Sequence, residues 1–361
     1  MVALGGVCLV SSSNWLSVYM AIELPTLSLF ILVAQKSASG QSVEAGAKYF
    51  ILGAVSSGLF LFGCALLCGF TGAVHITHMD LVLNPSLGFP QVQIAIGLLF
   101  IFIAFLFKLS AAPFHLWAPD VYEGAPTPTT ALLAIVPKIG IFFLFVSIGP
   151  PAGVLLISSL FSLVVGALGA LNQTKIKRLI AYSAIGHVGF ILWGVELGGY
   201  VSLIYVLLYV MMSVSIFSLV SGLRATRHLV VELSGLSRLQ PFLALSLALT
   251  LLSIAGIPPL AGFLGKWLVL LSGVGRAYYL IFVVAVLCSV IAGVYYVRVT
   301  KIIYFQTSYF LWVSSKILRR QKRINFKKAF LVGLCLYLIL FLFFSPGWLL
   351  AMASEASVGL F

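Results

Sequence analysis

Long uninterrupted runs of apolar residues recur along the whole chain and constrain its fold more than any other feature. Each run is about 20 residues or longer, the length that a helix needs to cross a bilayer. Hydrophobic residues make up 62% of the 361 residues and charged residues only 8%, so a water-soluble fold could not bury them all. Because the runs do not alternate as barrel strands do, the sequence predicts an all-α polytopic membrane protein.

The distribution of charge supports about ten transmembrane helices. The loops that follow odd-numbered spans hold most of the 21 lysine and arginine residues, whereas the loops on the other side hold only Arg276. A wrong count would mix the two sides, so the positive-inside rule favours ten crossings. The net charge of +13 therefore requires no nucleic-acid partner. The predicted spans are residues 14–34, 43–69, 91–117, 127–149, 152–171, 178–197, 199–222, 241–271, 277–304 and 329–352.

Two proline-containing segments break the apolar pattern in similar ways. One lies near residues 108–117 and the other near residues 253–266. Proline removes a helical hydrogen bond, and such breaks persist in membranes only where protein or water satisfies the freed backbone groups. The breaks fall in the third and eighth spans. Because an odd offset inverts the second unit relative to the first, they predict an inverted repeat.

These features predict five segments. Residues 1–13 contain a shortened N-terminal helix, since residues 1–10 would extend only about 15 Å as a helix. Residues 14–149 and 150–304 are the two repeats, residues 305–328 form a basic loop on the positively charged side, and residues 329–361 carry the last transmembrane helix. The run from Lys316 to Lys328 predicts an orientation anchor that contacts anionic lipid such as cardiolipin, with a partner-subunit contact as the alternative.

After the basic residues near span ends are counted with the loops, four lysines remain inside the predicted spans, namely Lys48, Lys108, Lys138 and Lys266, and Glu23 joins them. A charge at the centre of a bilayer costs about 2.5–3.5 kcal/mol, so charged residues at such positions usually have a function. Glu23 and Lys138 lie deep in their spans, which favours a functional role. The other three lie nearer to span ends, where extension of the side chain to the interface is the alternative.

Lysine and glutamate together suit proton transfer. Burial disfavours the charged form of a lysine, whereas a carboxylate about 4 Å away favours it by about 4 kcal/mol at an effective dielectric constant of 20. Movement of Glu23 relative to a lysine would therefore switch that lysine between binding and releasing a proton. His187 in the sixth span is a candidate relay, although a hydrogen-bonded core histidine is the more common role.

No pattern for a bound cofactor or metal is found. The sequence lacks a P-loop and lacks a GxGxxG motif after a strand. The five cysteines contain no CxxC pair and are expected to be structural thiols. We therefore expect no cofactor or metal in this chain, and any redox chemistry would lie elsewhere. The cysteines are Cys8, Cys64, Cys68, Cys288 and Cys335.

Several motifs make the chain recognisable. The most specific is FKLSAAPFHLWAPDVYEGAPTP at residues 107–128, which continues to Pro137 and Lys138. Others are IEL around Glu23, EAGAKYFILG at residues 44–53, NQTKIKRL at 172–179, and IAGIPP followed by Gly265 and Lys266. With these motifs the chain resembles the antiporter-like membrane subunits of respiratory complex I, and among them the subunit 2 family with its bacterial counterpart, subunit N.

The resemblance implies two inverted five-helix repeats, each with one broken helix, and proton translocation across the mitochondrial inner membrane. NADH oxidation and ubiquinone reduction would take place in other subunits, which would carry NADH, FMN, iron–sulfur clusters and ubiquinone. Other membrane-arm subunits and membrane lipids are the implied partners. The family's proton-translocating residues correspond here to Glu23, Lys48, Lys108, Lys138 and Lys266.

One departure from the family concerns the N-terminus. Bacterial relatives begin with three more helices, and their fourth is complete, so the chain is expected to be N-terminally shortened. A separate polypeptide that supplies the missing helices is then a candidate partner. Two other functions stay open beside proton translocation in complex I: a cation/proton antiporter subunit, and a purely structural spacer of the membrane arm.

Overall fold

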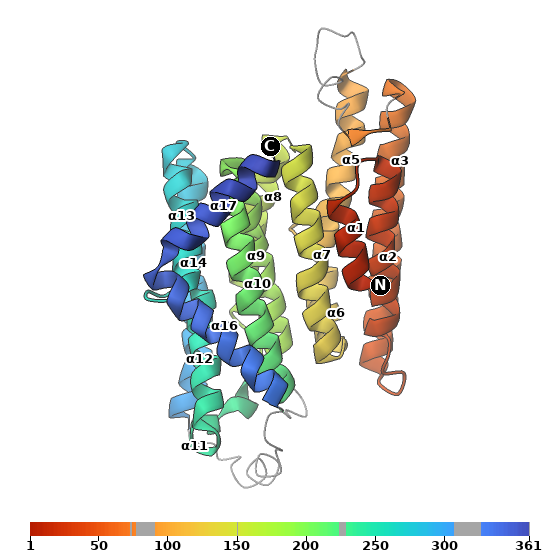
Figure 1. Cartoon of the computed structure of the whole chain (residues 1–361). Helices are drawn as coiled ribbons and strands as arrows, with labels where there is room; N and C mark the ends of the chain where they lie inside the picture. Colours follow the sequence, from red (N-terminus) through yellow and green to blue (C-terminus); the bar gives the residue numbers. More distant parts are fainter. Residues whose placement is uncertain (73, 77–90, 150, 224–228, 307–325, 361) are drawn as a thin grey trace. The chain divides into compact units, whose positions relative to one another are not determined.

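The computed structural model describes residues 1–72, 74–76, 91–149, 151–223, 229–306 and 326–360. These residues form helices joined by short connections, and they divide into two compact units, Met1–Val154 and Leu155–Phe361 (Figure 1). Nine of the described helices are long and apolar enough to cross a membrane, and two shorter apolar helices occupy the place of the predicted eighth span. The predicted all-α polytopic membrane fold is confirmed.

The first unit is held together by close helix packing. A Cβ atom at Gly63 would lie 2.7 Å from the carbonyl oxygen of Gly97, so α3 and α5 approach where both residues are small. The short helix α1 packs against α2 and α7 (Figure 1). The helices of this unit are α1 (Val2–Val10), α2 (Trp15–Val33), α3 (Gly40–Thr71), α5 (Gln91–Leu109), α6 (Trp117–Gly124) and α7 (Thr127–Ile148).

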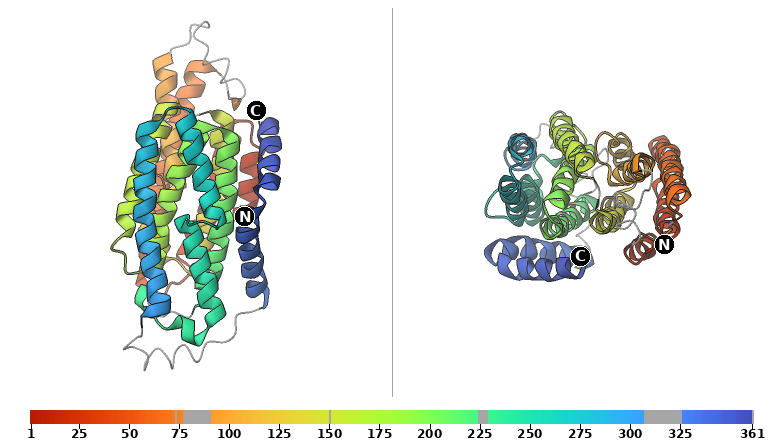
Figure 2. Two further views of the ribbon diagram at one scale, coloured as in Figure 1. Left: turned by 90° about the vertical axis from the view of Figure 1, so that its left-hand side faces the viewer. Right: turned by 90° about the horizontal axis from the view of Figure 1, so that it is seen from above.

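The second unit is built around α9 and α10. Their apolar windows are 78% and 72% buried, whereas those of α14 and α16 are only 28% and 22% buried. Figure 2 shows α16 and α17 against one face of this unit, where α16 contacts α10, α12 and α13. The elements are α8 (Ala152–Ala170), α9 (Ile176–Leu197), α10 (Gly199–Gly222), η3 (Val230–Leu233), α11 (Leu236–Leu239), α12 (Pro241–Ala255), α13 (Ala261–Gly275), α14 (Tyr279–Phe305), α16 (Phe326–Phe344) and α17 (Pro346–Leu360).

Both predicted helix breaks are present. Helix α5 ends at Leu109 and α6 begins at Trp117, while α12 ends at Ala255 and α13 begins at Ala261. Each break contains a cis peptide bond before a proline, Pro113 in the first and Pro259 in the second. The inverted relation of the two repeats stays a prediction.

The predicted last span was wrong in one respect. A single helix was expected over residues 329–352, but α16 ends at Phe344 and α17 begins at Pro346. Proline fits the first turn of a helix, where its missing N–H is not needed, but it interrupts a continuing helix. The chain therefore starts a new helix at Pro346.

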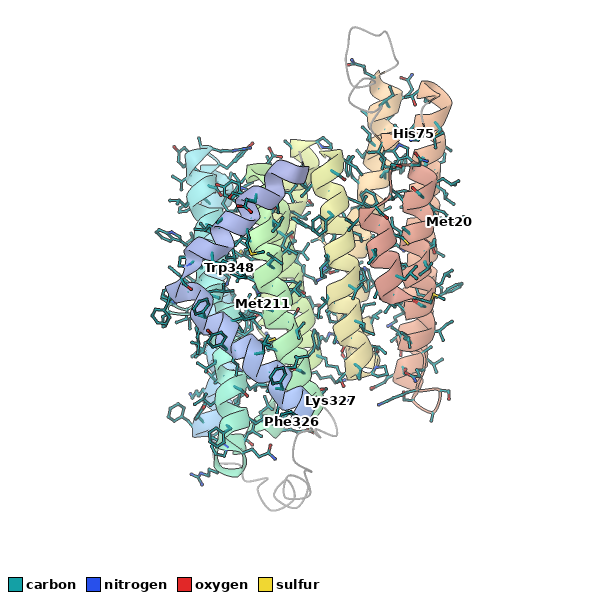
Figure 3. All side chains as sticks on the ribbon, viewed as in Figure 1. Met20, His75, Met211, Phe326, Lys327 and Trp348 are labelled. Atoms are coloured by element: carbon teal, nitrogen blue, oxygen red, sulfur yellow. The ribbon has the colours of Figure 1, made fainter. Side chains whose placement is uncertain are left out.

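Large apolar side chains cover the outside of both units. Met20 on α2 is 60% exposed, Phe326 on α16 is 84% exposed and Trp348 on α17 is 60% exposed. Their side chains point away from the ribbons in Figure 3. Exposed apolar surface of this extent suits contact with lipid tails.

Basic residues gather at one end of the second unit. Lys175 pairs with Leu229 through an isolated backbone bridge, and Arg298 Nη1 donates to the carbonyl oxygen of Leu171 at 3.2 Å. Lys328 Nζ donates to Ser221 Oγ at 3.0 Å. These contacts agree with the predicted charge asymmetry. Seven other residues of the predicted basic side lie outside the described residues: Arg224, Arg227, Lys316, Arg319, Arg320, Lys322 and Arg323.

Candidate functional site

Glu23 and Lys108 line the same small cavity in the first unit. The cavity lies among α2, α3 and α5 and has room for about one water molecule. Lys108 is only 7% exposed, and no ion pair within 4.0 Å joins these two described side chains. The structure therefore brings a carboxylate and an ammonium group to one cavity without an ion pair between these two described side chains.

Two hydroxyl groups hold the carboxylate of Glu23. Thr26 Oγ1 donates to Oε2 at 3.1 Å, and Ser57 Oγ on the neighbouring helix donates a short hydrogen bond to Oε1. Both carboxylate oxygens therefore have a donor, which fixes the orientation of the side chain. Sequence reasoning missed Ser57, because nothing in the local sequence indicates that it faces a residue 34 positions away.

Backbone carbonyl groups that the helix break after Lys108 frees accept hydrogen bonds from residues of the break. The indole Nε1 of Trp117 donates to the carbonyl oxygen of Phe107 at 2.9 Å, and the backbone N–H of Ala111 donates to Leu106 at 2.9 Å. Tyr49 stacks on Trp117 with ring centroids 4.9 Å apart. Lys108 lies in the last turn of α5, where the partial negative charge of a helix end favours a cation.

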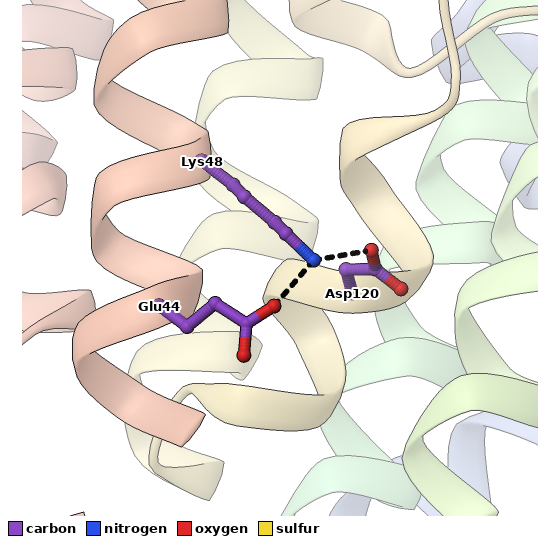
Figure 4. Close-up of polar contacts among 3 residues, drawn as sticks. All are labelled: Glu44, Lys48 and Asp120. Carbon is purple, nitrogen blue, oxygen red and sulfur yellow. Dashed lines mark hydrogen bonds and ion pairs between the residues drawn. The ribbon is translucent and has the colours of Figure 1, made fainter. Parts of the chain in front are cut away.

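Lys48 forms an ion-pair cluster with two carboxylates (Figure 4). Its Nζ lies 2.7 Å from Glu44 Oε1 and 3.1 Å from Asp120 Oδ2, and its side chain is 43% exposed. Helix α3 has 32 residues and is about 48 Å long, well beyond the bilayer core of about 30 Å. The structure therefore favours the interfacial alternative for Lys48. The helical spacing of four residues indicates Glu44 as a partner, but no local signal indicates Asp120.

Lys138 is buried deep in the first unit. Its exposure is 4%, and it follows Pro137 in the middle of α7, which packs against α1, α2 and α5. It does not belong to the lining of the Glu23 cavity. The structure thus places Lys138 in the protein interior, as expected from its depth in the span, and apart from the Glu23 cavity.

Lys266 is anchored at the second helix break. Its Nζ donates to the carbonyl oxygen of Ala255 at 2.7 Å and lies 5.7 Å from the centroid of the Phe190 ring. Ala255 is the last residue of α12, so the ammonium group meets the negative end of a helix. Lys266 is 6% exposed, and the break that frees the Ala255 carbonyl also supplies the partner of this buried charge.

His187 and Lys266 line one cavity in the second unit. The cavity has room for about one water molecule, and Tyr295 and Tyr296 belong to its lining. His187 Nδ1 lies 2.7 Å from the hydroxyl oxygen of Tyr205, and the tautomer of the ring decides which of the two donates. The structure brings His187 and Lys266 together as candidates. Tyr205 was missed because it lies on the next helix, 18 residues away.

The cysteines of the chain are free thiols. Cys288 and Cys335 are buried, Cys64 and Cys68 are half-buried, and Cys8 is exposed. Within the described ranges, no group of three or more histidine, cysteine, aspartate or glutamate side chains is arranged to hold a metal ion. The cysteines stay predicted structural thiols.

The sequence of residues 12–292 matches a family described as NADH:quinone oxidoreductase/Mrp antiporter, TM. The chain belongs to this NADH:quinone oxidoreductase/Mrp antiporter family. The match covers both helix breaks and all five charged residues predicted from the spans. The Glu23 cavity lies within the matched residues, and so does the Lys266 cavity apart from Tyr295 and Tyr296.

Similar members of the family are found among curated proteins and solved structures. Chain 2 of NADH-ubiquinone oxidoreductase from Metridium senile is 63% identical and aligns with 100% of this chain and 96% of its own length. Subunit N of NADH-quinone oxidoreductase from Rhodospirillum rubrum is 40% identical, covering 84% of this chain and 65% of that relative. A chain of respiratory complex I from Thermus thermophilus superimposes with a TM-score of 0.85 at 30% identity, over 97% of this chain and 78% of that one. The resemblance to the subunit 2 family is confirmed.

Proposed function

We propose that this chain is a proton-translocating subunit of the membrane arm of respiratory complex I, in the mitochondrial inner membrane. The observation that carries the proposal is the cavity that Glu23 shares with Lys108. NADH oxidation and ubiquinone reduction would take place in neighbouring subunits and drive the movement of protons here. This driver is necessary, because each proton moved against the membrane potential costs about 2.3 kcal/mol per 100 mV.

The electrostatics of the Glu23 cavity favour reversible binding of a proton by Lys108. While Glu23 is ionised, Coulomb attraction favours the ammonium form of Lys108, by about 4 kcal/mol at 4 Å and about 2 kcal/mol at 8 Å for an effective dielectric constant of 20. When Glu23 moves away or binds a proton, this attraction is lost and Lys108 releases its proton more readily. A water molecule in the cavity would carry the proton between the two groups.

We assign the same kind of role to the second cavity. Lys266 is held at the end of α12 by Ala255, and His187 lines the same space. A proton that leaves Lys266 has the imidazole of His187 as a candidate acceptor, and the hydrogen bond with Tyr205 would influence which ring nitrogen carries the proton. Lys138 would store a proton in the interior of the first unit, and Lys48 would act near the interface.

Neighbouring membrane-arm subunits and anionic lipids are the proposed partners. The basic end of the second unit, with Lys175, Arg298 and Lys328, carries the charge that would bind phospholipid headgroups such as those of cardiolipin. Apolar faces such as that of α16, with Phe326 exposed, would contact lipid tails or other subunits. FMN and iron–sulfur clusters would belong to those partners.

A double variant tests the pump against the structural spacer. We expect Glu23→Ala with Lys138→Ala to leave assembly of complex I intact and to remove NADH-driven proton pumping in proteoliposomes. Lys36→Ala is the matched control, because Lys36 is an exposed lysine outside the helices and should pump as the unchanged complex does. Full pumping by the double variant would support the spacer and contradict our proposal.

The family also contains antiporters, so cation/proton exchange is the second candidate function. It is tested in the same vesicles, without quinone, by imposing a sodium gradient and following the internal pH. We expect no sodium-dependent pH change beyond that of vesicles without protein. A sodium-dependent change that Lys108→Ala removes would favour the antiporter.

A further inference from the structure

The hydroxyl group of Ser57 has two acceptors within reach but only one proton to donate. Its Oγ contacts Oε1 of Glu23 through the short hydrogen bond, and it also lies 3.1 Å from the carbonyl oxygen of Gly53 in its own helix. A serine hydroxyl carries one donor and two acceptor lone pairs. It can therefore donate to Glu23 or to Gly53, but not fully to both.

The neighbouring serine decides which acceptor is used. Ser56 Oγ donates to the same Gly53 carbonyl oxygen at 2.7 Å, and Ser56 is 2% exposed. A carbonyl oxygen has two lone pairs, and the helical N–H takes one of them. With Ser56 on the other lone pair, the proton of Ser57 is directed to Glu23, and the Gly53 carbonyl is left as a weaker alternative acceptor.

Thr26 holds the second carboxylate oxygen in a similar way. Its Oγ1 lies 3.1 Å from Oε2 of Glu23 and 3.0 Å from the backbone carbonyl oxygen of Glu23. This hydroxyl also has a backbone acceptor available when it does not donate to the carboxylate. Both hydroxyls at Glu23 can therefore rotate without leaving their proton unpaired.

We propose that Ser57 is a positioning residue that keeps Glu23 directed into its cavity in both protonation states by rotating its hydroxyl between the Glu23 carboxylate and the Gly53 carbonyl. When Glu23 is ionised, Ser57 donates to Oε1. When Glu23 binds a proton, its own O–H donates to Ser57 Oγ, and the Ser57 proton turns to Gly53. Glu23 thus gains or loses one proton while the number of protons on Ser57 stays the same.

With this arrangement, the distance between Glu23 and Lys108 stays the same whether Glu23 is ionised or protonated. A carboxyl group that lost its partner on protonation would turn away and break the path through the cavity. A rotating hydroxyl avoids this, because its O–H donates and its oxygen lone pairs accept. The inference rests on the proposed function, since it assigns Ser57 to the proton step at Glu23.

Substitutions of two serines in the first unit test the inference. Ser57→Ala should slow NADH-driven proton pumping in proteoliposomes about tenfold, as expected for loss of one hydrogen bond to a charged group. Ser28→Ala in α2 is the matched control, because Ser28 Oγ donates to the Pro25 carbonyl of its own helix and does not line the cavity, and it should stay within about twofold of the unchanged complex. Ser57→Thr, which keeps the hydroxyl, should restore most of the rate. Equal rates in Ser57→Ala and Ser28→Ala would overturn the inference.

A spectroscopic readout separates positioning from general packing. Glu23→Gln identifies the infrared band of the protonated Glu23 carboxyl group, because the band disappears in that variant. This band should shift to higher frequency in Ser57→Ala, where one hydrogen-bond partner is lost, but not in Ser28→Ala. An unshifted band would overturn the inference. If Ser57→Ala does not assemble, Ser57→Cys replaces it with the same expectation, since a thiol is a weak donor.

Different results would contradict the proposed function and the role of Ser57. If Lys108→Ala pumps normally, the proposed function itself is contradicted. If Lys108→Ala loses pumping while Ser57→Ala pumps like the control, only the role of Ser57 is contradicted. Loss of pumping in both variants, with the control unaffected, supports the proposed function and the role of Ser57 together.

Discussion

The ammonium nitrogen of Lys266 lies 2.7 Å from the carbonyl oxygen of Ala255, at the residue where α12 ends. The first break is arranged differently, because Trp117 occupies the carbonyl of Phe107 and Lys108 donates no hydrogen bond to another described residue. Lys266 is thus anchored to its helix break, whereas Lys108 interacts with its surroundings through charge. This difference suits Lys108 to respond to Glu23.

Gly256 makes the anchor of Lys266 possible. It adopts φ +85°, and a Cβ atom there would lie 2.8 Å from Cδ of Lys266. We expect Gly256→Ala to destabilise the chain by about 1–3 kcal/mol, from the left-handed conformation and the displaced lysine. The midpoint of thermal denaturation in purified complex should fall. Gly293→Ala in α14 is the control, since no atom lies within 4 Å of its added Cβ, and an equal fall there would contradict this explanation.

Trp117 should stabilise the first break through a single hydrogen bond. Trp117→Phe keeps most of the ring stacking with Tyr49 but removes the indole donor, so that the Phe107 carbonyl keeps only the backbone N–H of Ser110, at 3.0 Å. We expect a loss of about 0.5–1.5 kcal/mol, the net contribution of one hydrogen bond, seen as a lower midpoint of thermal denaturation. Trp267→Phe serves as the control, because Trp267 is 53% exposed. A midpoint unchanged in both variants would show that the indole bond contributes little.

The ion pair of Lys48 with Asp120 should contribute little to stability. Both side chains are more than a third exposed, and exposed pairs typically couple by about 0.2–1 kcal/mol. A double-mutant cycle of Lys48→Met and Asp120→Asn should give a coupling energy in this range, with normal assembly of the complex. A coupling above about 2 kcal/mol would mean that the pair is shielded from solvent in the assembled complex.

The fold could be predicted to a large extent because its main signals are local. Span length, charge asymmetry and the proline breaks are visible in the sequence, and the structure contains helices in each of the ten predicted spans. The missed break at Pro346 shows the limit, since prolines also occur inside α2 and α7 without ending them. Whether a proline ends a membrane helix depends on neighbours that a sequence pattern does not specify.

The site was predictable in its charged members but not in their partners. Glu23, Lys138 and Lys266 were found because charge is costly in an apolar span. Ser57 and Tyr205 were not, because a single hydroxyl in a membrane helix usually bonds its own backbone and costs little. Only the packing of α3 on α2, and of α10 on α9, shows that these hydroxyls face Glu23 and His187.

The most direct test of the proposed function is the ratio of protons pumped to electrons transferred in complex I that carries Lys108→Met. The variant keeps most of the length of the side chain but removes its charge from the cavity shared with Glu23. We expect assembly and the subunit composition to be preserved and the ratio to fall, while Lys36→Met, in an exposed loop, leaves the ratio unchanged. A ratio for Lys108→Met equal to that of the unchanged complex, at equal rates of NADH oxidation, would contradict the account.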